Sequence, residues 1–433
     1  MKDKIKIGLL GLGTVGVGVC KVLTENAHEI SQKVGRAVEV KTVLVRDVNK
    51  KRNIVGNFVI TDKIETILDD PEIDIVIELM GGTEPSRTYM LRALQSGKNV
   101  VTANKDVVAE HGKEMFEAAE SADVDFMFEA SVGGGIPIIT PLKQCLTANK
   151  ITEVIGIVNG TTNYMLTKMT KEGMDYNTVL AEAQAKGYAE SDPTADVGGL
   201  DAARKAAILS SIAFNTRVTL DKVYVEGITK ITPQDVEYAT ELGYVIKLLA
   251  IAKDSPENGV DVRVHPAFVP KAHPLAAVND VFNAIFVKGN AIGEAMFYGR
   301  GAGALPTASA VVADVVDVSR DIVNQTFGRI RCTCFEDKKF CPVENTVSSY
   351  YVRLLVEDQP GVLGSIACAF GDQGVSLNSV IQTRRVANQA EIVVITHCVT
   401  EANLRKATHV LNELPVVTEI RNVIRVEKSQ EVN

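Results

Sequence analysis

The first part of the chain alternates short apolar segments with stretches in which apolar residues recur at helical spacing. The apolar segments, which we expect to be strands, are Lys4–Leu10, Val38–Val45, Ile73–Leu79, Asn99–Thr102 and Asp125–Phe128. Helices are predicted at Thr14–Ser31, Pro85–Ser96 and Gly112–Ser121. Because Ile73–Leu79 is almost continuously apolar, we expect a strand that is covered on both faces. This alternation predicts an α/β fold with a doubly wound parallel sheet.

Further along the chain, strand and helix patterns mix without strict alternation, which indicates an α+β domain. Its expected strands are Ile151–Val158, Val223–Ile228, Tyr244–Lys253, Val260–Val269 and Asn283–Val287. Its expected helices are Thr161–Lys171, Thr178–Lys186, Leu200–Phe214 and Leu305–Val323. A last unit, from Tyr350 to about Val426, has the order strand, helix, strand, strand, helix, strand.

These patterns predict four parts. Residues 1–150 form the parallel-sheet domain, which part of 300–325 completes. Residues 151–325 form the α+β domain, 326–349 a linker, and 350–433 a small βαββαβ domain. An exposed strand edge in such a small unit favours pairing with a second copy.

Composition narrows the class of protein. The 433 residues are 46% hydrophobic and 23% charged, which excludes wholesale disorder. A net charge of −8 argues against nucleic acid and against an anionic membrane surface as partners. No apolar run reaches the ~18 residues that a membrane-spanning helix needs, so we expect a cytoplasmic protein.

The seven cysteines do not form a disulfide framework. Four of them lie in apolar sequence and are predicted to be core residues: Cys20, Cys145, Cys368 and Cys398. The other three, Cys332, Cys334 and Cys341, match no common zinc spacing, which favours a structural role. A redox or metal role for these three stays open.

A glycine-rich turn follows the first expected strand and leads directly into a helix. Its sequence is Gly11, Leu12, Gly13, Thr14, Val15 and Gly16, the G-x-G-x-x-G arrangement. In the order strand, turn, helix, this arrangement is typical of dinucleotide binding in a Rossmann-type sheet. The helix N-terminus then offers free N–H groups to a pyrophosphate.

The end of the second expected strand bears on the choice of cofactor. Arg46 and Asp47 are adjacent there, and Lys50, Lys51 and Arg52 follow. An acidic residue favours the ribose hydroxyl of NAD, whereas an arginine can bind the 2′-phosphate of NADP. Because basic residues outnumber the acid, we expect NADP, with NAD use possible.

Three further segments lie where strands are expected to end, at the edge of the sheet where ligands bind in this class of fold. Lys105 follows Asn99–Thr102 and could bind a carbonyl or carry a proton. Gly81 and Gly82 follow another strand. The run Gly133–Gly135 follows a third, and its accessible carbonyl groups would suit a hard cation.

An acidic segment before the helix at Leu200 is the most informative part of the sequence. Four carboxylates fall between Glu190 and Asp201. Asp201 and Lys205 are four apart and share one face of an otherwise apolar helix. Such a pair is either an ion pair at a domain seam or part of a site, and acidic loops can hold the ammonium group of an amino-acid-like ligand.

Five segments together resemble homoserine dehydrogenases over residues 1 to about 325: G-L-G-T-V-G, T-A-N-K-D, F-E-A-S-V-G-G-G-I-P, N-G-T-T-N-Y and G-Y-A-E-S-D-P-T-A-D-V-G-G-L-D-A-A-R-K. The terminal unit resembles an ACT domain. The resemblance implies NAD(P)H-dependent reduction of L-aspartate 4-semialdehyde to L-homoserine, towards threonine, methionine and isoleucine. It also implies a homo-oligomer, either a dimer or a tetramer.

The resemblance also implies roles for single residues. Lys205 would be the general acid–base, Lys105 would assist and lie near the cofactor, and Asp201 would hold Lys205 or a water. The residues implied to contact substrate are Glu190, Asp196, Gly160 and Thr161. Those implied to form a monovalent cation site, usually for sodium and largely through backbone oxygens, are Glu129, Val132, Gly134 and Ile136. The family often has another small residue in place of Gly134. Gly303, from the later part of the chain, would contact the bound nucleotide.

In the ACT-like unit, the resemblance places an amino-acid effector near Asp358, Gly361 and Asn378, with threonine the expected ligand. Two rival functions remain at this stage. One is a non-catalytic sensor of the nicotinamide redox state, and the other is a reductase for a different semialdehyde or keto acid.

Overall fold

The computed structural model describes residues 3–52, 56–386 and 389–427 of the chain. The chain divides into two compact units that alternate along the sequence. The first consists of Met1–Val154, Arg204–Lys222 and Phe282–Asp337. The second consists of Ile155–Ala203, Val223–Val281 and Lys338–Asn433. Two elements, β7 (Ile151–Ile157) and α9 (Leu200–Ala213), cross from one unit into the other.

The first unit contains the predicted parallel sheet. Its strands are β1 (Lys4–Leu10), β2 (Ala37–Leu44), β3 (Val59–Thr61), β4 (Ile75–Glu78), β5 (Asn99–Thr102) and β6 (Phe126–Met127). They follow the order β3-β2-β1-β4-β5-β6, and every neighbouring pair is parallel. The order reverses between β1 and β4, and ligands of such sheets bind outside the carboxyl ends of the strands at this point.

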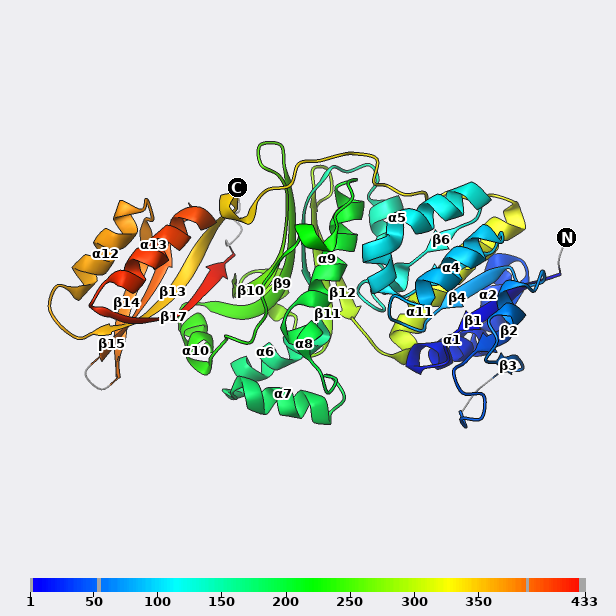
Figure 1. Ribbon diagram of the computed structural model, residues 1–433, viewed down its shortest axis with the longest axis horizontal. Coiled ribbons are helices and arrows are strands. Elements are labelled where there is room, and N and C mark those ends of the chain that lie inside the picture. Colours follow the sequence, from blue (N-terminus) through cyan, green and yellow to red (C-terminus); the bar gives the residue numbers. More distant parts are fainter. Residues whose placement is uncertain (1–2, 53–55, 387–388, 428–433) are drawn as a thin grey trace. The chain divides into compact units, whose positions relative to one another are not determined.

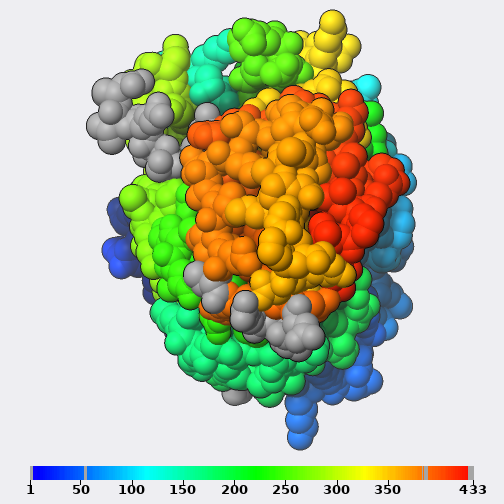
Figure 2. Space-filling view, turned by 90° about the vertical axis from the view of Figure 1, so that its left-hand side faces the viewer, coloured from blue at the N-terminus to red at the C-terminus, as the bar shows by residue number. Residues whose placement is uncertain are grey.

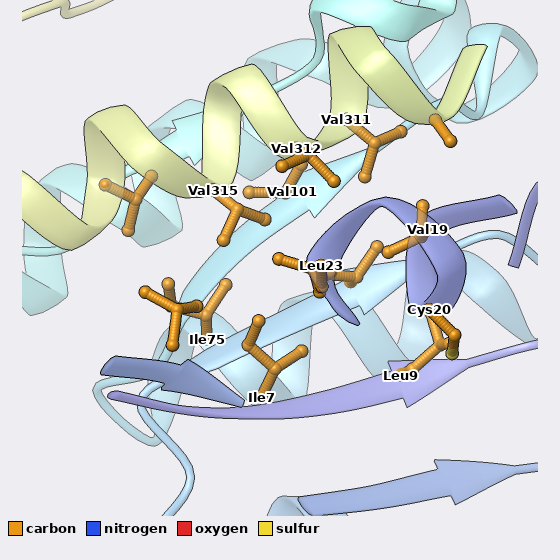
Figure 3. Close-up of a cluster of buried hydrophobic side chains, with 14 of the residues drawn as sticks. Ile7, Leu9, Val19, Cys20, Leu23, Ile75, Val101, Val311, Val312 and Val315 are labelled. Atoms are coloured by element: carbon orange, nitrogen blue, oxygen red, sulfur yellow. The ribbon is translucent and has the colours of Figure 1, made fainter. Parts of the chain in front are cut away.

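Helices cover both faces of this sheet. Ile7, Leu9 and Ile75 form one core with α1 (Thr14–Glu25), α2 (Ala27–Val34) and α11 (Ala304–Asn324), and Figure 3 shows the valines of α11 above β1. The position between Ile7 and Leu9 faces the opposite side, where Gly8 lies against Ile67 of α3 (Glu65–Leu68). The remaining helices are α4 (Ser86–Gln95) and α5 (Lys105–Ala122), which pack on each other.

The sequence placed most strands well but was wrong about several boundaries. The predicted helix Thr14–Ser31 is broken at Asn26 into α1 and α2. The helix predicted from Gly112 begins at Lys105. Elements that the sequence did not predict include β3, α3, α10 (Pro233–Glu241) and β12 (Gly293–Arg300). Among the cysteines predicted to be core residues, Cys20 is buried, but Cys145, Cys368 and Cys398 are exposed.

The second unit combines helices with a long antiparallel hairpin. The hairpin strands are β9 (Tyr244–Ser255) and β10 (Gly259–Pro270), with β8 (Tyr224–Val225) beside β10. Its helices are α6 (Gly160–Glu172), α7 (Tyr176–Ala185), α8 (Thr194–Val197) and α10. In the first unit, β11 (Phe282–Gly289) pairs with β12. Short 3-10 turns occur at Leu220–Lys222, Pro274–Ala277 and Val343–Asn345.

The C-terminal part of the second unit has the predicted βαββαβ order. It consists of β13 (Val347–Glu357), α12 (Val362–Asp372), β14 (Leu377–Val386), β15 (Gln389–Thr396), β16 (Val399–Thr400), α13 (Glu401–Glu413) and β17 (Val417–Val426). Figure 1 shows α12 and α13 on one face of its sheet, and Figure 2 shows the surface that these residues form, coloured orange to red. We call this part the C-terminal module. Its strand β17 also pairs with β10, so the hairpin and the module share one sheet in the order β9-β10-β17-β13-β15-β14.

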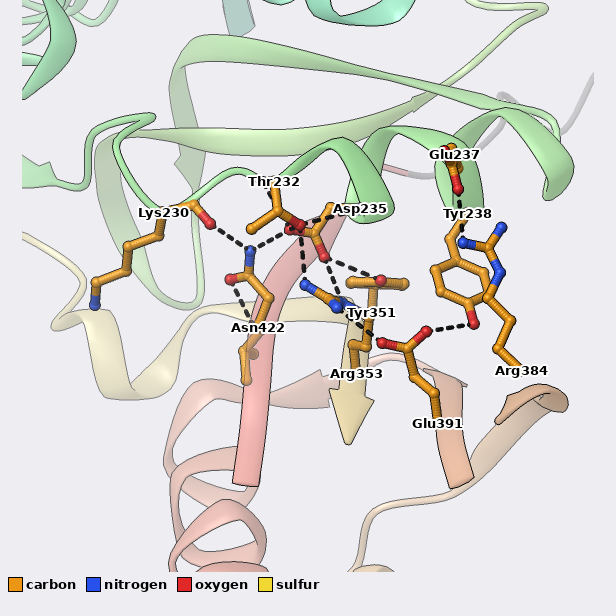
Figure 4. A network of polar contacts seen from close by, with 11 residues as sticks. Lys230, Thr232, Asp235, Glu237, Tyr238, Tyr351, Arg353, Arg384, Glu391 and Asn422 are labelled. Atoms are coloured by element: carbon orange, nitrogen blue, oxygen red, sulfur yellow. Dashed lines mark hydrogen bonds and ion pairs between the residues drawn. The ribbon is translucent and has the colours of Figure 1, made fainter. Parts of the chain in front are cut away.

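A buried network of charges joins the C-terminal module to α10 (Figure 4). Asp235 of α10 has no exposed surface and accepts from Arg353 Nε of β13 at 2.9 Å and from Asn422 Nδ2 of β17 at 2.8 Å. Arg353 also donates to Glu391 of β15 at 2.8 Å, and the Tyr238 hydroxyl donates to the same carboxylate at 2.7 Å. Each buried carboxylate is therefore paired and hydrogen-bonded, as burial of a charge requires.

Candidate active site

The glycine turn after β1 has the geometry that close approach of a ligand requires. A Cβ on Gly16 would lie 2.3 Å from the Gly11 carbonyl oxygen, so the first turn of α1 can pack on the loop only with glycine there. By contrast, a Cβ on Gly13 would meet nothing within 4 Å. The space beside Gly13 is therefore open at the N-terminus of α1, where N–H groups favour a phosphate.

A hollow of ≈ 540 Å³ lies beside this turn. It extends along the ends of β1, β2 and β4, and its lining residues include Gly11, Leu12, Gly13, Arg46, Asp47, Lys50, Arg52 and Met80. Thr14 and Val15 are the first two residues of α1. Arg46 and Lys50 are exposed, whereas Arg52 donates to the carbonyl groups of Asp47 and Lys50. This rim is rich in cations, which suits a phosphorylated ligand.

Gly303 precedes the first residue of α11, and its φ of +123° is one that residues with a side chain rarely adopt. Helix α11 packs on α1, so the later part of the chain returns to the helix that begins at the glycine turn. The contact with the nucleotide that the resemblance implied for Gly303 stays a prediction.

Lys105 is the first residue of α5, and buried polar contacts fix its position. Asn104 caps the helix by accepting from the Val107 N–H, and it donates to the Gly82 carbonyl at 2.8 Å. The fully buried Glu78, at the end of β4, accepts from Thr102 at 2.8 Å and from the Met80 N–H at 2.7 Å. The ends of β4 and β5 are thereby fastened together directly before Lys105.

An ion pair links α5 to the helix that carries Lys205. Arg204 Nε lies 2.9 Å from Asp106 Oδ1, and both side chains are mostly shielded from solvent. Arg204 precedes Lys205, and Asp106 follows Lys105. The neighbours of the two candidate lysines are thus in contact within the first unit, and both lysines are half-buried.

In the second unit, Asn159 brings two of the candidate carboxylates together. Its Nδ2 donates to Asp196 Oδ1 at 2.7 Å and to Asp201 Oδ2 at 2.8 Å. Its Oδ1 accepts from the Thr162 N–H at 2.8 Å and so caps α6. A single buried amide therefore orients both carboxylates.

The remaining residues predicted to contact substrate lie near the same helix end. Gly160 is the first residue of α6, and the Thr161 hydroxyl donates to the Tyr188 carbonyl at 2.6 Å. Glu190 is exposed, and its carbonyl accepts from Gln184 at 3.0 Å. Asp192 accepts hydrogen bonds from the N–H and the hydroxyl of Thr194 and so stabilises the turn in which it lies.

Glu129 has a structural role that the sequence did not reveal. Its buried carboxylate accepts the backbone N–H groups of Ile138 at 2.6 Å, Ile139 at 2.8 Å and Thr140 at 2.7 Å. Its own N–H donates to Asp314, whose pKa is raised well above its usual value by burial and by the charge of Glu129. These three hydrogen bonds show that the Glu129 carboxylate holds the backbone of Ile138 to Thr140 in place.

The glycine run beside Glu129 requires small residues. A Cβ on Gly134 would lie 2.3 Å from the Gly301 carbonyl oxygen, and the φ of Gly134 is +57°. Val132 and Ile136 are both buried. Across the described ranges, no three or more histidine, cysteine or acidic side chains gather as metal ligands would. The donor set that remains at this loop is carbonyl oxygen, which suits hard cations.

The candidate effector residues lie at two ends of the C-terminal module, because Asn378 is at the start of β14, level with Thr396 of β15, whereas Asp358 and Gly361 follow the end of β13, level with Gln389. Asp358, Gly361 and Asn378 are all exposed, and Gly361 precedes the first residue of α12. Asn378 lies on β14, which is the last strand of the sheet. An outer strand of a sheet is a surface where a second copy could bind.

Asn159, Glu78 and Asn104 are the polar residues that sequence reasoning missed. Each acts by fixing the backbone or another side chain. The signals were present but weak: an asparagine before G-T-T, another before Lys105, and an acid at the end of an apolar strand. Within the part of the chain that is described, no helix has the length and apolarity to cross a membrane.

The parallel sheet, the glycine turn and the paired lysine-bearing helices define an NAD(P)-dependent oxidoreductase that acts on a CH–OH group. Sequence profiles described as "Homoserine dehydrogenase, NAD binding domain", "Homoserine dehydrogenase" and "ACT domain" match residues 11–129, 137–316 and 350–416. A homoserine dehydrogenase of Synechocystis sp. is 47% identical over 98% of this chain and 99% of its own length. The chain belongs to the homoserine dehydrogenase family, and the family predicted from the sequence is confirmed.

Solved structures agree with this membership. A homoserine dehydrogenase from Thiobacillus denitrificans has a TM-score of 0.94 at 44% identity, covering 98% of both chains. A hyperthermophilic archaeal homoserine dehydrogenase, solved in complex with NADPH, has a TM-score of 0.64 at 25% identity, covering 76% of this chain and 100% of its own. A nicotinamide cofactor is therefore supported.

Proposed function

We propose that this protein reduces L-aspartate 4-semialdehyde to L-homoserine with NAD(P)H and catalyses the reverse reaction, in the cytoplasm, on the route to threonine, methionine and isoleucine. The observation that carries the proposal is the Arg204–Asp106 ion pair, which fastens the segment containing Lys205 to the start of α5 at Lys105. The segments that carry the two half-buried lysines are thus in contact.

The bound nicotinamide would supply and accept the hydride. Reduction of an aldehyde places negative charge on its oxygen, and a nearby cation must stabilise this charge while a proton arrives. We assign the proton transfer at that oxygen to the Nζ of Lys205 and an assisting role to Lys105. Asp201 positions Lys205 or a water. Asp196 and Glu190 bind the substrate ammonium group, and Gly160 and Thr161 line the pocket.

Asn159 supports this assignment of the carboxylates. Its amide donates to both Asp196 and Asp201, so the two carboxylates are held close to each other at the start of α6. Charge-assisted hydrogen bonds make acidic side chains common partners of an ammonium group.

We propose NADP as the preferred cofactor, with NAD use possible. The open space at Gly13 accommodates the close approach of a pyrophosphate, and the cationic rim at Arg46 accommodates a 2′-phosphate. The archaeal relative in complex with NADPH is consistent with this preference. We further propose a monovalent cation, sodium, on backbone oxygens at Glu129, Val132, Gly134 and Ile136.

We also propose that each predicted domain has its own function. The nucleotide is bound by residues 1–150 together with part of 300–325. The substrate is bound by residues 151–325, which also form the contacts of a dimer or tetramer. A linker, 326–349, connects these parts to the regulatory domain, 350–433. Threonine is the proposed effector at Asp358, Gly361 and Asn378. Deleting the C-terminal module would be a poor test, because it removes β17 from β10 and Arg353 from Asp235. Asp358→Ala should instead weaken threonine inhibition without loss of basal turnover.

Replacement of Lys205 tests the catalytic proposal. Lys205→Ala should lower kcat by about 10²–10⁴-fold, the usual contribution of one general acid–base, and should leave the Kd for NADP unchanged. Lys113 on α5 is a matched control, because its side chain is 76% exposed, and Lys113→Ala should retain turnover within twofold. A Lys205→Ala rate within threefold of the parent would remove Lys205 from the mechanism.

A further inference from the structure

A small pocket in the first unit contains chemistry that the proposed reaction does not use. Its volume is about 20 Å³, which is room for one water-sized molecule. One wall is formed by α5 and α9, and its lining residues there are Val108, Ala109, Gly112, Phe116, Ala207, Ile208, Ser211 and Ile212. The lining also includes the segment Cys332–Cys334 and two cations, Lys143 and Arg217.

The two thiols in this pocket are in mutual contact. The thiol and the backbone N–H of Cys334 both donate to the sulfur of Cys332. The Cys334 sulfur also lies 3.8 Å from the Ser211 carbonyl oxygen, so its proton has two possible acceptors. Both cysteines are only half-buried, so small solutes can reach them. The two sulfurs are therefore within hydrogen-bonding reach of each other.

Cations surround the sulfur of Cys332. Arg217 Nη2 donates to it at 3.4 Å. Lys143 lies over two aromatic rings, with its Nζ 4.8 Å from the Phe116 ring centre and 5.4 Å from that of Phe128. These donors and charges lower the pKa of Cys332 to about 5, while the contact with Cys332 and burial raise the pKa of Cys334. Burial in the same pocket lowers the pKa of Lys143 to about 8.

We propose that Cys332 and Cys334 form a peroxide-reactive dithiol, in which Cys332 is the attacking residue and Cys334 the resolving residue. The arrangement has the features of a reactive thiol: a stabilised thiolate, partial exposure, and a second thiol in contact. Neither the proposed reaction nor the family assignment requires these groups.

The chemistry balances with hydrogen peroxide as the oxidant. The Cys332 thiolate attacks one peroxide oxygen, so that an S–O bond forms, the O–O bond breaks, and the released hydroxide takes up a proton to leave as water. Cys334 then attacks the Cys332 sulfur, an S–S bond forms, and the hydroxyl group leaves as water with the Cys334 proton. Two thiols lose two electrons in total, and one peroxide becomes two waters.

Thiolate formation alone does not give selectivity, because a thiol of lower pKa is also a weaker nucleophile. The additional contribution comes from Arg217 and Lys143, which can stabilise the charge that develops on the departing oxygen. An exposed cysteine such as Cys368 or Cys398 has easier access to peroxide, but no comparable pair of cations appears among its described contacts.

The test uses the reduced full-length protein at pH 6, where a thiol with a pKa near 8.5 is only about 0.3% ionised. After exposure to equimolar hydrogen peroxide, free thiols are alkylated and mapped by mass spectrometry. We expect a disulfide between Cys332 and Cys334, while Cys145, Cys368 and Cys398 remain alkylated. Oxidation of the exposed cysteines as fast as that of Cys332 would overturn the proposal.

Single variants separate the two roles. Cys334→Ser should stop at a sulfenic acid on Cys332 that dimedone traps, whereas Cys332→Ser should leave Cys334 reduced. Arg217→Gln should slow the oxidation of Cys332 at least tenfold, and Arg217→Lys should restore part of the rate. Equal peroxide consumption by Cys332→Ser and the parent, or an unchanged rate in Arg217→Gln, would contradict the assigned roles.

Discussion

The nucleotide hollow of the first unit and the charged network of the second unit use polar residues in opposite ways. Around the hollow, Arg46 and Lys50 are exposed and the space at Gly13 is open. In the network, Asp235, Arg353 and Glu391 are buried and satisfy one another. The charges beside the hollow are accessible to a ligand, whereas the charges of the network make their hydrogen bonds within the fold.

The largest effect expected from this comparison is on stability. Arg353→Met should lower the free energy of unfolding by about 3–5 kcal/mol, because it leaves the carboxylates of Asp235 and Glu391 buried without their cation. Arg421 is a matched control on β17, since it pairs with Glu419 at 2.9 Å and both side chains are at least 40% exposed. Arg421→Met should cost less than ~1 kcal/mol. Urea denaturation measures both, and equal losses would break the comparison.

A second prediction concerns the rim of the hollow. Arg46→Ala should raise the KM for NADP by about 10–100-fold, since hydrogen bonds to a charged group contribute about 1.5–3 kcal/mol. The KM for NAD, which lacks the 2′-phosphate, should stay within twofold. Stability should not change, because Arg46 is exposed. Equal changes for the two cofactors would show that Arg46 does not contact the phosphate.

A third prediction distinguishes a glycine that leaves room for a ligand from a glycine that the packing of the fold requires. Gly13→Ala should weaken NADP binding about tenfold, because the new methyl group enters the open space, yet should change the free energy of unfolding by less than ~1 kcal/mol. Gly16→Ala should destabilise the first unit, because its Cβ would meet the Gly11 carbonyl. Isothermal titration and thermal unfolding give the two quantities. Unchanged NADP affinity in Gly13→Ala would place the phosphates elsewhere.

The smallest effect concerns pH. His265 on β10 is fully buried, and burial together with the charges of Arg425 and Arg263 lowers its pKa well below the usual value. Below about pH 6.5 the unfolded chain therefore binds a proton at this residue that the folded chain does not bind. Stability should then fall with falling pH, by up to about 1.4 kcal/mol per pH unit from this residue.

The control for this effect is His265→Asn, which keeps a donor for the Pro266 carbonyl oxygen, 2.9 Å from Nδ1 in the parent, but does not titrate. Its unfolding free energy should depend less steeply on pH between 6.5 and 5.5. Parallel pH profiles for the parent and the variant would show that another group is responsible.

The sequence predicted those parts of the fold whose burial is periodic. Strands β1, β4 and β5 are almost entirely buried, and apolar residues dominate β1 and β4, so their positions were clear. By contrast, β12 alternates between exposed and half-buried residues and contains two glycines, so its pattern resembles a loop. The first turns of α5 were missed because Lys105, Asp106 and Glu110 interrupt the apolar spacing.

The sequence predicted which segments contribute to the candidate site but not how their side chains are arranged. Glycines, lysines and acids in known spacing identified the family and most candidate residues. Their mutual positions depend on contacts between distant residues, such as Asn159 with Asp196 or Arg204 with Asp106. A periodic pattern reports burial within one element and carries no information on which distant side chain a polar group meets.

The order of synthesis gives the pairing of β17 with β10 a further consequence. Asp235 precedes its cation Arg353 by 118 residues, and its partner Asn422 is 187 residues away. At ~5–20 residues per second, the nascent chain holds this carboxylate without Arg353 for roughly 6–24 s. The hairpin β9–β10 must wait longer still for β17. During synthesis, the second unit therefore has an exposed sheet edge at β10 and a carboxylate, Asp235, that lacks its cation. Chaperones would have the most exposed sheet edge to protect during this interval.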